Sequence, residues 1–148
     1  MANVCKFIMA AALLGAMQLA MAGESPQEQR HELMEDVRGH AKTIARMLEG
    51  EDAFDADAAM GAFQAWSEAA DVFGGLFPEG TESGFDTRAT AAVWSDRAGF
   101  EAALSAWSEA VDAAIAANPQ DLESLKAAAG PVFKQCKACH EDYRLEED

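Results

Sequence analysis

The chain has 148 residues, half of them apolar, which is enough for one domain with a substantial core and argues against intrinsic disorder. Its 26 acidic residues outnumber 11 basic ones and give a formal charge of −15 at pH 7. Such a surface repels phosphate groups, which excludes nucleic acids and anionic membranes as partners, and a protein partner is expected to present a basic patch.

The first 22 residues are predicted to be a signal peptide. Lys6 is the only charge before an apolar run over residues 7–22, which is shorter than the roughly 20 residues that a membrane-spanning helix needs. The run ends in Ala20-Met21-Ala22, the small-x-small pattern that signal peptidase accepts. We therefore expect cleavage after Ala22, export to an oxidising compartment, and a mature domain over residues 23–148 with no membrane attachment. The alternative is that the run forms an apolar first helix or a membrane anchor.

The first helix of the mature chain is predicted over about residues 26–49. Ser25 is a suitable N-cap residue, Glu28 completes a capping box with it, and Gly50 ends the helix. Apolar residues recur at three- and four-residue spacing and form one inward stripe: Met34, Val37, Ala41, Ile44 and Leu48.

Three further amphipathic helices are predicted over about residues 55–73, 90–117 and 120–148. Residues 76–88 contain proline and glycine and are expected to form a long ordered loop. Gly130-Pro131 should kink the last helix or divide it. Strand patterns are nearly absent, so the four helices predict an all-α fold, an antiparallel four-helix bundle.

One heptapeptide occurs twice with a single difference, as AWSEAAD at residues 65–71 and as AWSEAVD at residues 106–112. We interpret the pair as two helices that use similar residues to solve one packing problem. The alternative interpretation is a duplicated functional unit.

The sequence Cys136-Lys-Ala-Cys139-His140 admits three interpretations. In the first it attaches haem c: each thiol adds to a haem vinyl group and the histidine binds the iron, since a helix places Cys136 and His140 one turn apart on the same side. In the second it is a redox dithiol, which usually stands at the start of a helix after a strand. In the third it binds zinc, which requires four ligands, whereas cleavage removes Cys5 and leaves only two other histidines. The exported context and the motif together favour haem c.

Residues 30–144 resemble cytochrome c prime, the class II c-type cytochromes. The resemblance rests on Arg30 and Met34 in a first helix that ends in LEGE, on LFPEGT in the loop, on TRATAAVWSD after it and, most specifically, on CKACHEDYR in the last helix. It implies a four-helix bundle with one haem c attached to the last helix through Cys136 and Cys139, an iron bound by His140, and a homodimer formed through the first two helices.

The first helix decides what faces the iron opposite His140. Projected at about 100° per residue, Arg30 falls inside the stripe of Met34, whereas His40 lies on its margin and His31 outside it. A second histidine ligand is therefore not expected, and both histidines are interpreted as surface groups.

Met34 admits three roles: a plain core residue, a sixth iron ligand, or, as the resemblance implies, a bulky apolar guard that is close to the iron without binding it. In low-spin relatives a methionine nearer the chain start binds the iron. Residues 23–33 contain no methionine, so the unbonded role is predicted for Met34.

An inward-pointing arginine is costly unless its charge is matched. We therefore expect Arg30 to pair with a haem propionate; the alternative is an exposed arginine at a frayed helix end. The resemblance places Thr87 near the haem edge and Arg144 against the haem. Taken alone, Arg144 is a cation that suits the C-terminus of a helix.

Iron with one strong ligand and a guarded apolar face is expected to be five-coordinate and high-spin, and to admit small neutral gases such as NO and CO. The sequence therefore predicts a periplasmic gas-binding haem protein, an electron carrier that docks a basic redox partner on its acidic surface, or both. A low-spin, six-coordinate carrier with Met34 as sixth ligand is the alternative. No general acid or base is predicted beside the site, so an enzyme is not expected.

Overall fold

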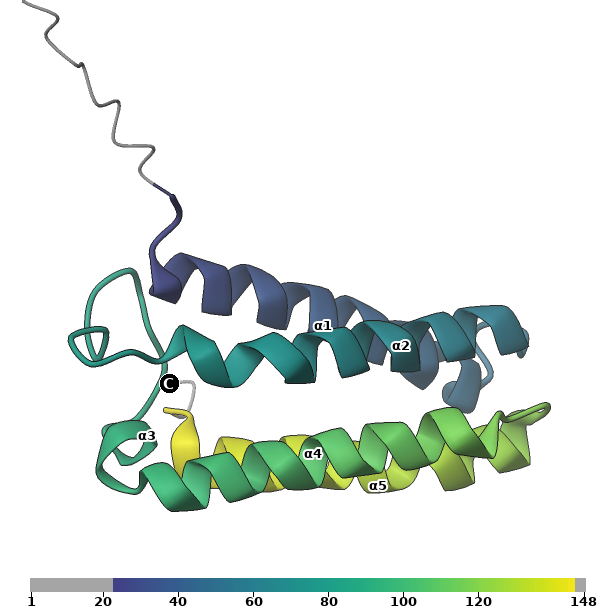
Figure 1. The fold of residues 1–148 in the computed structure, drawn as a ribbon. Helices are drawn as coiled ribbons and strands as arrows, with labels where there is room; N and C mark the ends of the chain where they lie inside the picture. The colour runs from purple at the N-terminus through teal and green to yellow at the C-terminus, as the bar shows by residue number, and fades with distance from the viewer. Residues whose placement is uncertain (1–22, 146–148) are drawn as a thin grey trace, which may run out of the picture.

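A computed structural model describes residues 23–145; the predicted signal peptide and residues 146–148 lie outside this range. Its helical elements are α1 (Pro26–Glu49), α2 (Ala56–Phe73), the 3₁₀ turn η1 (Gly74–Leu76), α3 (Ala92–Ser95), α4 (Arg97–Ala117) and α5 (Leu122–Tyr143). The four long helices run antiparallel in sequence order, with α1 beside α2 and α4 beside α5 (Figure 1). The predicted four-helix bundle is confirmed.

Local side-chain chemistry sets most of the helix ends. At the start of α1 the Glu28 N–H donates to the Ser25 hydroxyl at 3.2 Å, and the Ser25 N–H donates to the Glu28 carboxylate at 2.7 Å. The predicted capping box is therefore present, and α1 ends at Gly50, whose φ of 76° is left-handed and favours glycine. The carboxylates of Asp55 and Asp121 cap α2 and α5.

Two predictions for the second half of the chain need correction. The helix expected over residues 90–117 is two helices, because Asp96 leaves the helical conformation with φ −121° and ψ 55°. Its carboxylate then accepts the Gly99 N–H at 3.2 Å and starts α4 as an N-cap. Of the two outcomes expected at Gly130-Pro131, a kink or a division of the helix, the division does not occur, because α5 continues through Pro131, which is exposed.

Buried apolar side chains form two clusters. The first, called here the bundle core, lies along all four long helices, and its larger members are Ile44, Met47, Phe63, Trp66, Trp107, Val111, Leu125 and Val132. The second, called here the end cluster, consists of Phe77, Val93, Phe100 and Tyr143. It lies where α3, the start of α4 and the end of α5 meet (Figure 1). Leu104 packs against both clusters and marks their junction.

The two tryptophans of the repeated heptapeptide, Trp66 and Trp107, both lie in the bundle core, which agrees with the packing interpretation. Their indole N–H groups differ: that of Trp66 donates to the Val37 carbonyl at 3.0 Å, whereas that of Trp107 is buried without a hydrogen-bond partner.

Residues 23–145 contain no helix that is both long and apolar enough to cross a bilayer. Within the same range the only β-type pairing is an isolated antiparallel bridge between Ala89 and Arg144.

Candidate functional site

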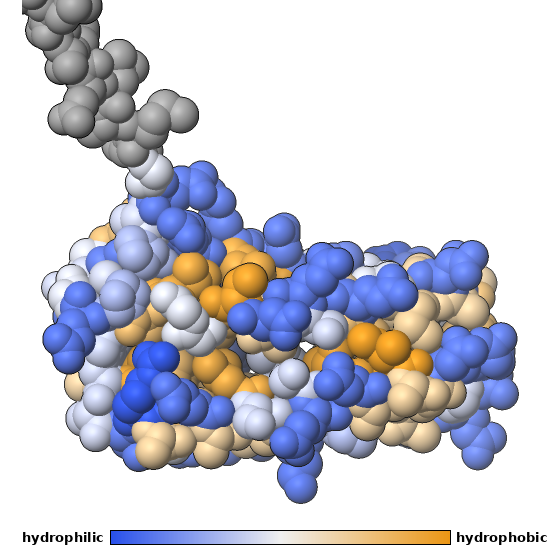
Figure 2. All heavy atoms as spheres, viewed as in Figure 1, coloured by the Kyte–Doolittle hydropathy of each residue, from blue (hydrophilic) through white to orange (hydrophobic). Residues whose placement is uncertain are grey.

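The two cysteines of the motif pack against different parts of the interior. Cys136 is half-buried against the bundle core, and Cys139 is half-buried against the end cluster. Both lie in the C-terminal part of α5, which ends at Tyr143. The motif therefore lies at the junction between the two clusters. On the face seen in Figure 2, apolar residues gather between the two helix pairs.

Both thiols are free and are protonated at neutral pH. Burial raises the pKa of the Cys136 thiol. Burial, together with the neighbouring Cys136 and Asp142, raises the pKa of Cys139 to about 11. A redox dithiol needs the opposite, a lowered pKa that supplies the thiolate nucleophile. The surroundings of this pair therefore do not favour the dithiol interpretation.

His140 follows Cys139 directly and lies three residues before the end of α5. Partial desolvation and the nearby positive charge of Arg144 lower the pKa of His140, although much of its side chain is reached by solvent. A lowered pKa keeps the imidazole neutral at pH 7, which is the form that binds a metal.

These groups fit the requirements of haem c. Covalent attachment needs two reduced thiols and an adjacent nitrogen ligand, and α5 presents Cys136, Cys139 and His140 in that order. The bundle core also holds the unpaired indole N–H of Trp107, a kind of buried group that in native proteins usually has an additional partner such as a ligand or water. In residues 23–145, no three His, Cys, Asp or Glu side chains gather as a metal site.

Arg30 points inward, as predicted, and is 6 % exposed. One terminal nitrogen donates to the Leu76 carbonyl at 2.9 Å and the Thr81 hydroxyl at 3.1 Å; the other donates to the Thr81 carbonyl at 2.9 Å and the Thr87 hydroxyl at 3.1 Å. The guanidinium also lies over the Phe77 ring, 4.6 Å from its centroid. The alternative of an exposed arginine at a frayed helix end is therefore wrong.

The bonds of Arg30 limit what else it can bind. Each terminal nitrogen carries two N–H groups, and each already makes two hydrogen bonds, so only the Nε–H remains for another acceptor. Burial lowers the pKa of Arg30, an effect that the charge of Glu82 opposes. The pairing of Arg30 with a propionate stays a prediction, and it would use the Nε–H or displace a loop acceptor.

Arg30 and Thr87, which lie 57 positions apart in the chain, are brought into contact. The sequence analysis missed Thr81, which is 9 % exposed and whose hydroxyl also donates to the Pro78 carbonyl at 2.8 Å. Its only signal was its place at the end of LFPEGT, because a threonine in a loop gives no sign of burial by itself.

The remaining predicted residues lie at separate places in the structure. Met34 is half-buried against the bundle core, as is Cys136. Arg144 is half-buried, and its N–H donates to the His140 carbonyl at 3.2 Å. His31 is exposed, with its ring centroid 6.1 Å from that of Phe85, and His40 lines an outer groove between α1 and α2. The expectation that neither histidine faces the interior agrees with these positions.

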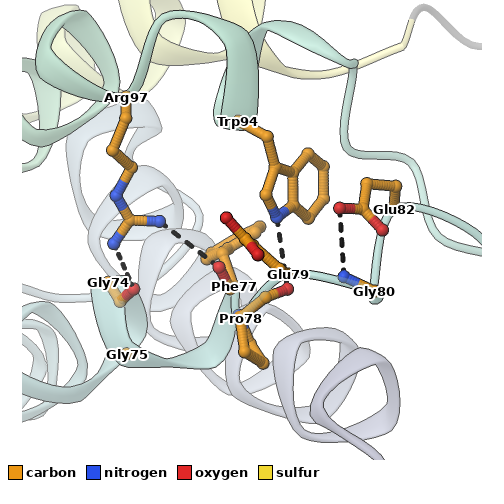
Figure 3. Close-up of a pocket in the computed structure, with 9 residues that line it drawn as sticks. All are labelled: Gly74, Gly75, Phe77, Pro78, Glu79, Gly80, Glu82, Trp94 and Arg97. Carbon is orange, nitrogen blue, oxygen red and sulfur yellow. Dashed lines mark hydrogen bonds between the residues drawn. The ribbon is translucent and has the colours of Figure 1, made fainter.

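A hollow at the end of the bundle that carries the motif does not contain the motif itself. It has a volume of about 740 Å³ and lies beside the loop after α2, lined by Phe77, Trp94 and Arg97 among others (Figure 3). The Arg97 guanidinium donates to the Gly74 carbonyl at 3.0 Å, and the Trp94 indole N–H donates to the Pro78 carbonyl at 3.2 Å. These bonds brace the loop that Arg30 holds from within the bundle, and no motif residue lines the hollow.

Comparison with known proteins gives one consistent result. Residues 25–144 match the family described as Cytochrome C′. Cytochrome c-556 of Agrobacterium fabrum is 32% identical over 143 residues, which cover 95% of each protein. The solved structure of cytochrome c′ from Rhodopseudomonas palustris superimposes with a TM-score of 0.81 at 31% identity, covering 85% of this chain and 100% of that one. A nitric oxide complex of a mutant of cytochrome c′ from Alcaligenes xylosoxidans superimposes with a TM-score of 0.71 at 27% identity, covering 82% of this chain and 98% of the other.

Proposed function

The chain belongs to the cytochrome c′ family, with haem c as its covalently attached cofactor, and we propose that it is a periplasmic haem protein whose five-coordinate iron binds NO and CO. The observation that carries this proposal is the position of Cys136 and Cys139 at the junction of the two apolar clusters, with His140 directly after Cys139 on the same helix. That position gives a haem on α5 an apolar environment on the bundle side.

In this proposal Cys136 and Cys139 attach the haem and His140 ligates the iron. Each thiol adds its sulfur to one carbon of a vinyl group and its hydrogen to the other, so the attachment consumes no oxidant. The raised pKa of both thiols keeps them protonated, and the lowered pKa of His140 keeps its imidazole neutral and available as a ligand. Arg30, Thr87 and Arg144 complete the proposed cofactor-binding set at the edge of the site.

The haem, when bound, supplies an iron with one open coordination position. On α1, the apolar side chains of Met34 and Val37 pack against the bundle core. Such a surface admits small neutral molecules and disfavours charged ligands, which would have to lose their hydration. The nitric oxide complex of the Alcaligenes xylosoxidans relative supports the choice of gas.

Met34 is proposed to guard the open position without binding the iron. Met34→Ala removes most of a flexible side chain from the α1 face, so we expect the affinity for CO and NO to rise. Val37→Ala, one turn further along the same face, is the matched control and should change the affinity less. Unchanged gas affinity in Met34→Ala, measured by CO titration of the ferrous protein, would remove Met34 from this role.

Export and assembly are further parts of the proposal. We infer that residues 1–22 are a signal peptide removed after Ala22, which leaves residues 23–148 as the periplasmic domain; mass spectrometry of the protein from a periplasmic extract tests the cleavage site.

A homodimer through α1 and α2 is supported by an outer groove of about 290 Å³ whose lining includes Leu33, Ala69 and Val72, and Val72 is 53 % exposed. Val72→Glu should shift the mature protein to monomers in analytical ultracentrifugation.

A second candidate function is a low-spin electron carrier in which Met34 is the sixth ligand and the acidic surface docks a basic redox partner. The observation in its favour is that Met34 and Cys136 pack against the same core. The visible spectrum of the reduced protein separates the two candidates. A high-spin spectrum that changes when CO is added supports the gas-binding protein, and a sharp six-coordinate spectrum that ignores CO contradicts it.

A further inference from the structure

The end of α5 is joined to the start of α4 by one carboxylate. Tyr143, the last residue of α5, is buried, and its hydroxyl donates to Oδ2 of Asp96 at 3.1 Å. The other carboxylate oxygen of Asp96 accepts the Gly99 N–H and caps α4. Asp96 therefore fixes the first turn of α4 and the last turn of α5 at the same time.

Gly99 leaves the space for the contact between Asp96 and Tyr143, called here the joint. A Cβ atom at this position would lie 2.2 Å from Oδ2 of Asp96 and 2.5 Å from the hydroxyl oxygen of Tyr143. Both distances are far shorter than the separation at which non-bonded atoms attract one another. Any other residue at position 99 would push the two partners apart, so the joint depends on three residues from two helix ends.

Backbone hydrogen bonds hold the same turn of α5 from the other side. The Thr90 N–H donates to the Tyr143 carbonyl at 3.0 Å, and the Leu145 N–H donates to the Arg88 carbonyl at 2.7 Å. The last carbonyls of a helix lack partners within the helix, and helix ends fray for that reason. Here the loop after α2 supplies hydrogen-bond partners at the end of α5.

Ring packing continues the connection into the bundle. The Tyr143 ring meets Phe100 edge-on with centroids 5.3 Å apart, and Phe100 meets Phe77 at 4.9 Å. Phe77 in turn lies beneath the guanidinium of Arg30. The end of α5 is thereby connected through the end cluster to α1.

We propose that Asp96 and Tyr143 are positioning residues that fix the last turn of α5, and with it the imidazole of His140, for ligation of the iron. His140 precedes Tyr143 by three residues, and Cys139 packs against the cluster that contains Tyr143. Rotation or fraying of this turn would move the imidazole and one attachment point together. The inference rests on the proposed function, because it assigns His140 as the iron ligand.

The test uses Tyr143→Phe in the mature, haem-loaded protein, because phenylalanine keeps the ring and removes only the hydroxyl. We expect amide hydrogen exchange in residues 140–145 to become about tenfold faster, equivalent to about 1.4 kcal/mol of local stability. The iron–histidine stretching band in the resonance Raman spectrum of the ferrous protein should broaden or shift. Asp96→Ala should reproduce both changes.

Two further variants separate positioning from general stability. Asp96→Asn can still accept the Gly99 N–H and can donate its amide to the Tyr143 hydroxyl, so it should keep the wild-type band. Asp55→Ala removes the cap of α2 at the other end of the bundle, and it should lower global stability without changing the band.

A Tyr143→Phe protein with wild-type exchange and a wild-type band would overturn the inference, as would a band shift of equal size in Asp55→Ala. Failure of the proposed function looks different, because the wild-type protein itself would then lack covalent haem or show a six-coordinate spectrum.

Discussion

The two ends of the bundle are built by different kinds of interaction. At the end formed by the turns over residues 50–55 and 118–121, called here the capped end, the hydrogen bonds are local: Asp55 accepts from Ala58, and Asp121 accepts from Ser124. At the opposite end, called here the motif end, Arg30 bonds to residues 46 to 57 positions away, and Tyr143 bonds to a residue 47 positions away.

The difference shows how the fold serves its site. Local caps can end a helix, but they cannot fix one helix relative to another, because donor and acceptor belong to the same turn. The motif end carries Cys139 and His140, and their proposed roles in holding the haem depend on their position relative to α1 and α4. Long-range polar contacts to α1, α4 and the loop after α2 are therefore concentrated where geometry affects function.

Among variants that test this difference between the two ends, Arg30→Gln is expected to change stability the most. The change leaves acceptors in the loop without a donor, and hydrogen bonds to charged groups are worth about 1.5–3 kcal/mol each, so we expect a loss of about 3 kcal/mol in the free energy of unfolding. Guanidinium unfolding of the mature protein, followed by circular dichroism, measures it. Arg38→Gln is the matched control, because Arg38 lies on the same helix in an exposed ion pair with Glu35. This variant should change the free energy of unfolding little. Equal losses in the two variants would show that Arg30 does not hold the loop.

A smaller effect is expected from Gly99→Ala, which places a methyl group inside the contact between Asp96 and Tyr143. We expect a loss of about 1–3 kcal/mol, as for other overpacked sites. Gly39→Ala is the control, because a Cβ there meets nothing within 4 Å. An alanine in the interior of α1 should raise the free energy of unfolding by about 0.5–1 kcal/mol. Thermal denaturation of both variants checks that the two changes in stability have opposite signs. A stabilised Gly99→Ala protein would contradict the close contact between Asp96, Gly99 and Tyr143.

The same contrast explains what could be predicted from the sequence. The capped end and the start of α1 were predictable, because Ser25, Glu28 and Gly50 act on neighbouring residues through rules that depend on spacing alone. The covalent attachment motif was recognisable for the same reason. At the motif end, the burial of Thr81 escaped prediction, because it depends on residues that are adjacent only in the folded chain. The break at Asp96 was missed as well; its cap on Gly99 is local, but its bond to Tyr143 exists only in the folded chain.

The tryptophan pair makes the same point inside the bundle. The identical stretch AWSEA predicts that both Trp66 and Trp107 are buried, and both are. It cannot predict that one indole N–H reaches the Val37 carbonyl while the other is unpaired. Burial follows from the spacing of apolar residues along one helix. Whether a buried N–H is hydrogen-bonded depends on which acceptors the neighbouring helix places beside it.

The smallest expected effect belongs to the capped end and completes the comparison. Asp55→Ala removes the acceptor for the Ala58 N–H, which donates to the carboxylate at 2.9 Å, and loss of such a cap costs about 0.5–2 kcal/mol. Asp55→Asn keeps an acceptor of nearly equal capping strength, so it should unfold like the wild type. Gas affinity and the visible spectrum should stay unchanged in both variants, because this turn and the motif lie at opposite ends of the bundle (Figure 1). A spectral change in Asp55→Ala would mean that the two ends are coupled through the bundle, and it would weaken the claim that the geometry of the site is set at the motif end alone.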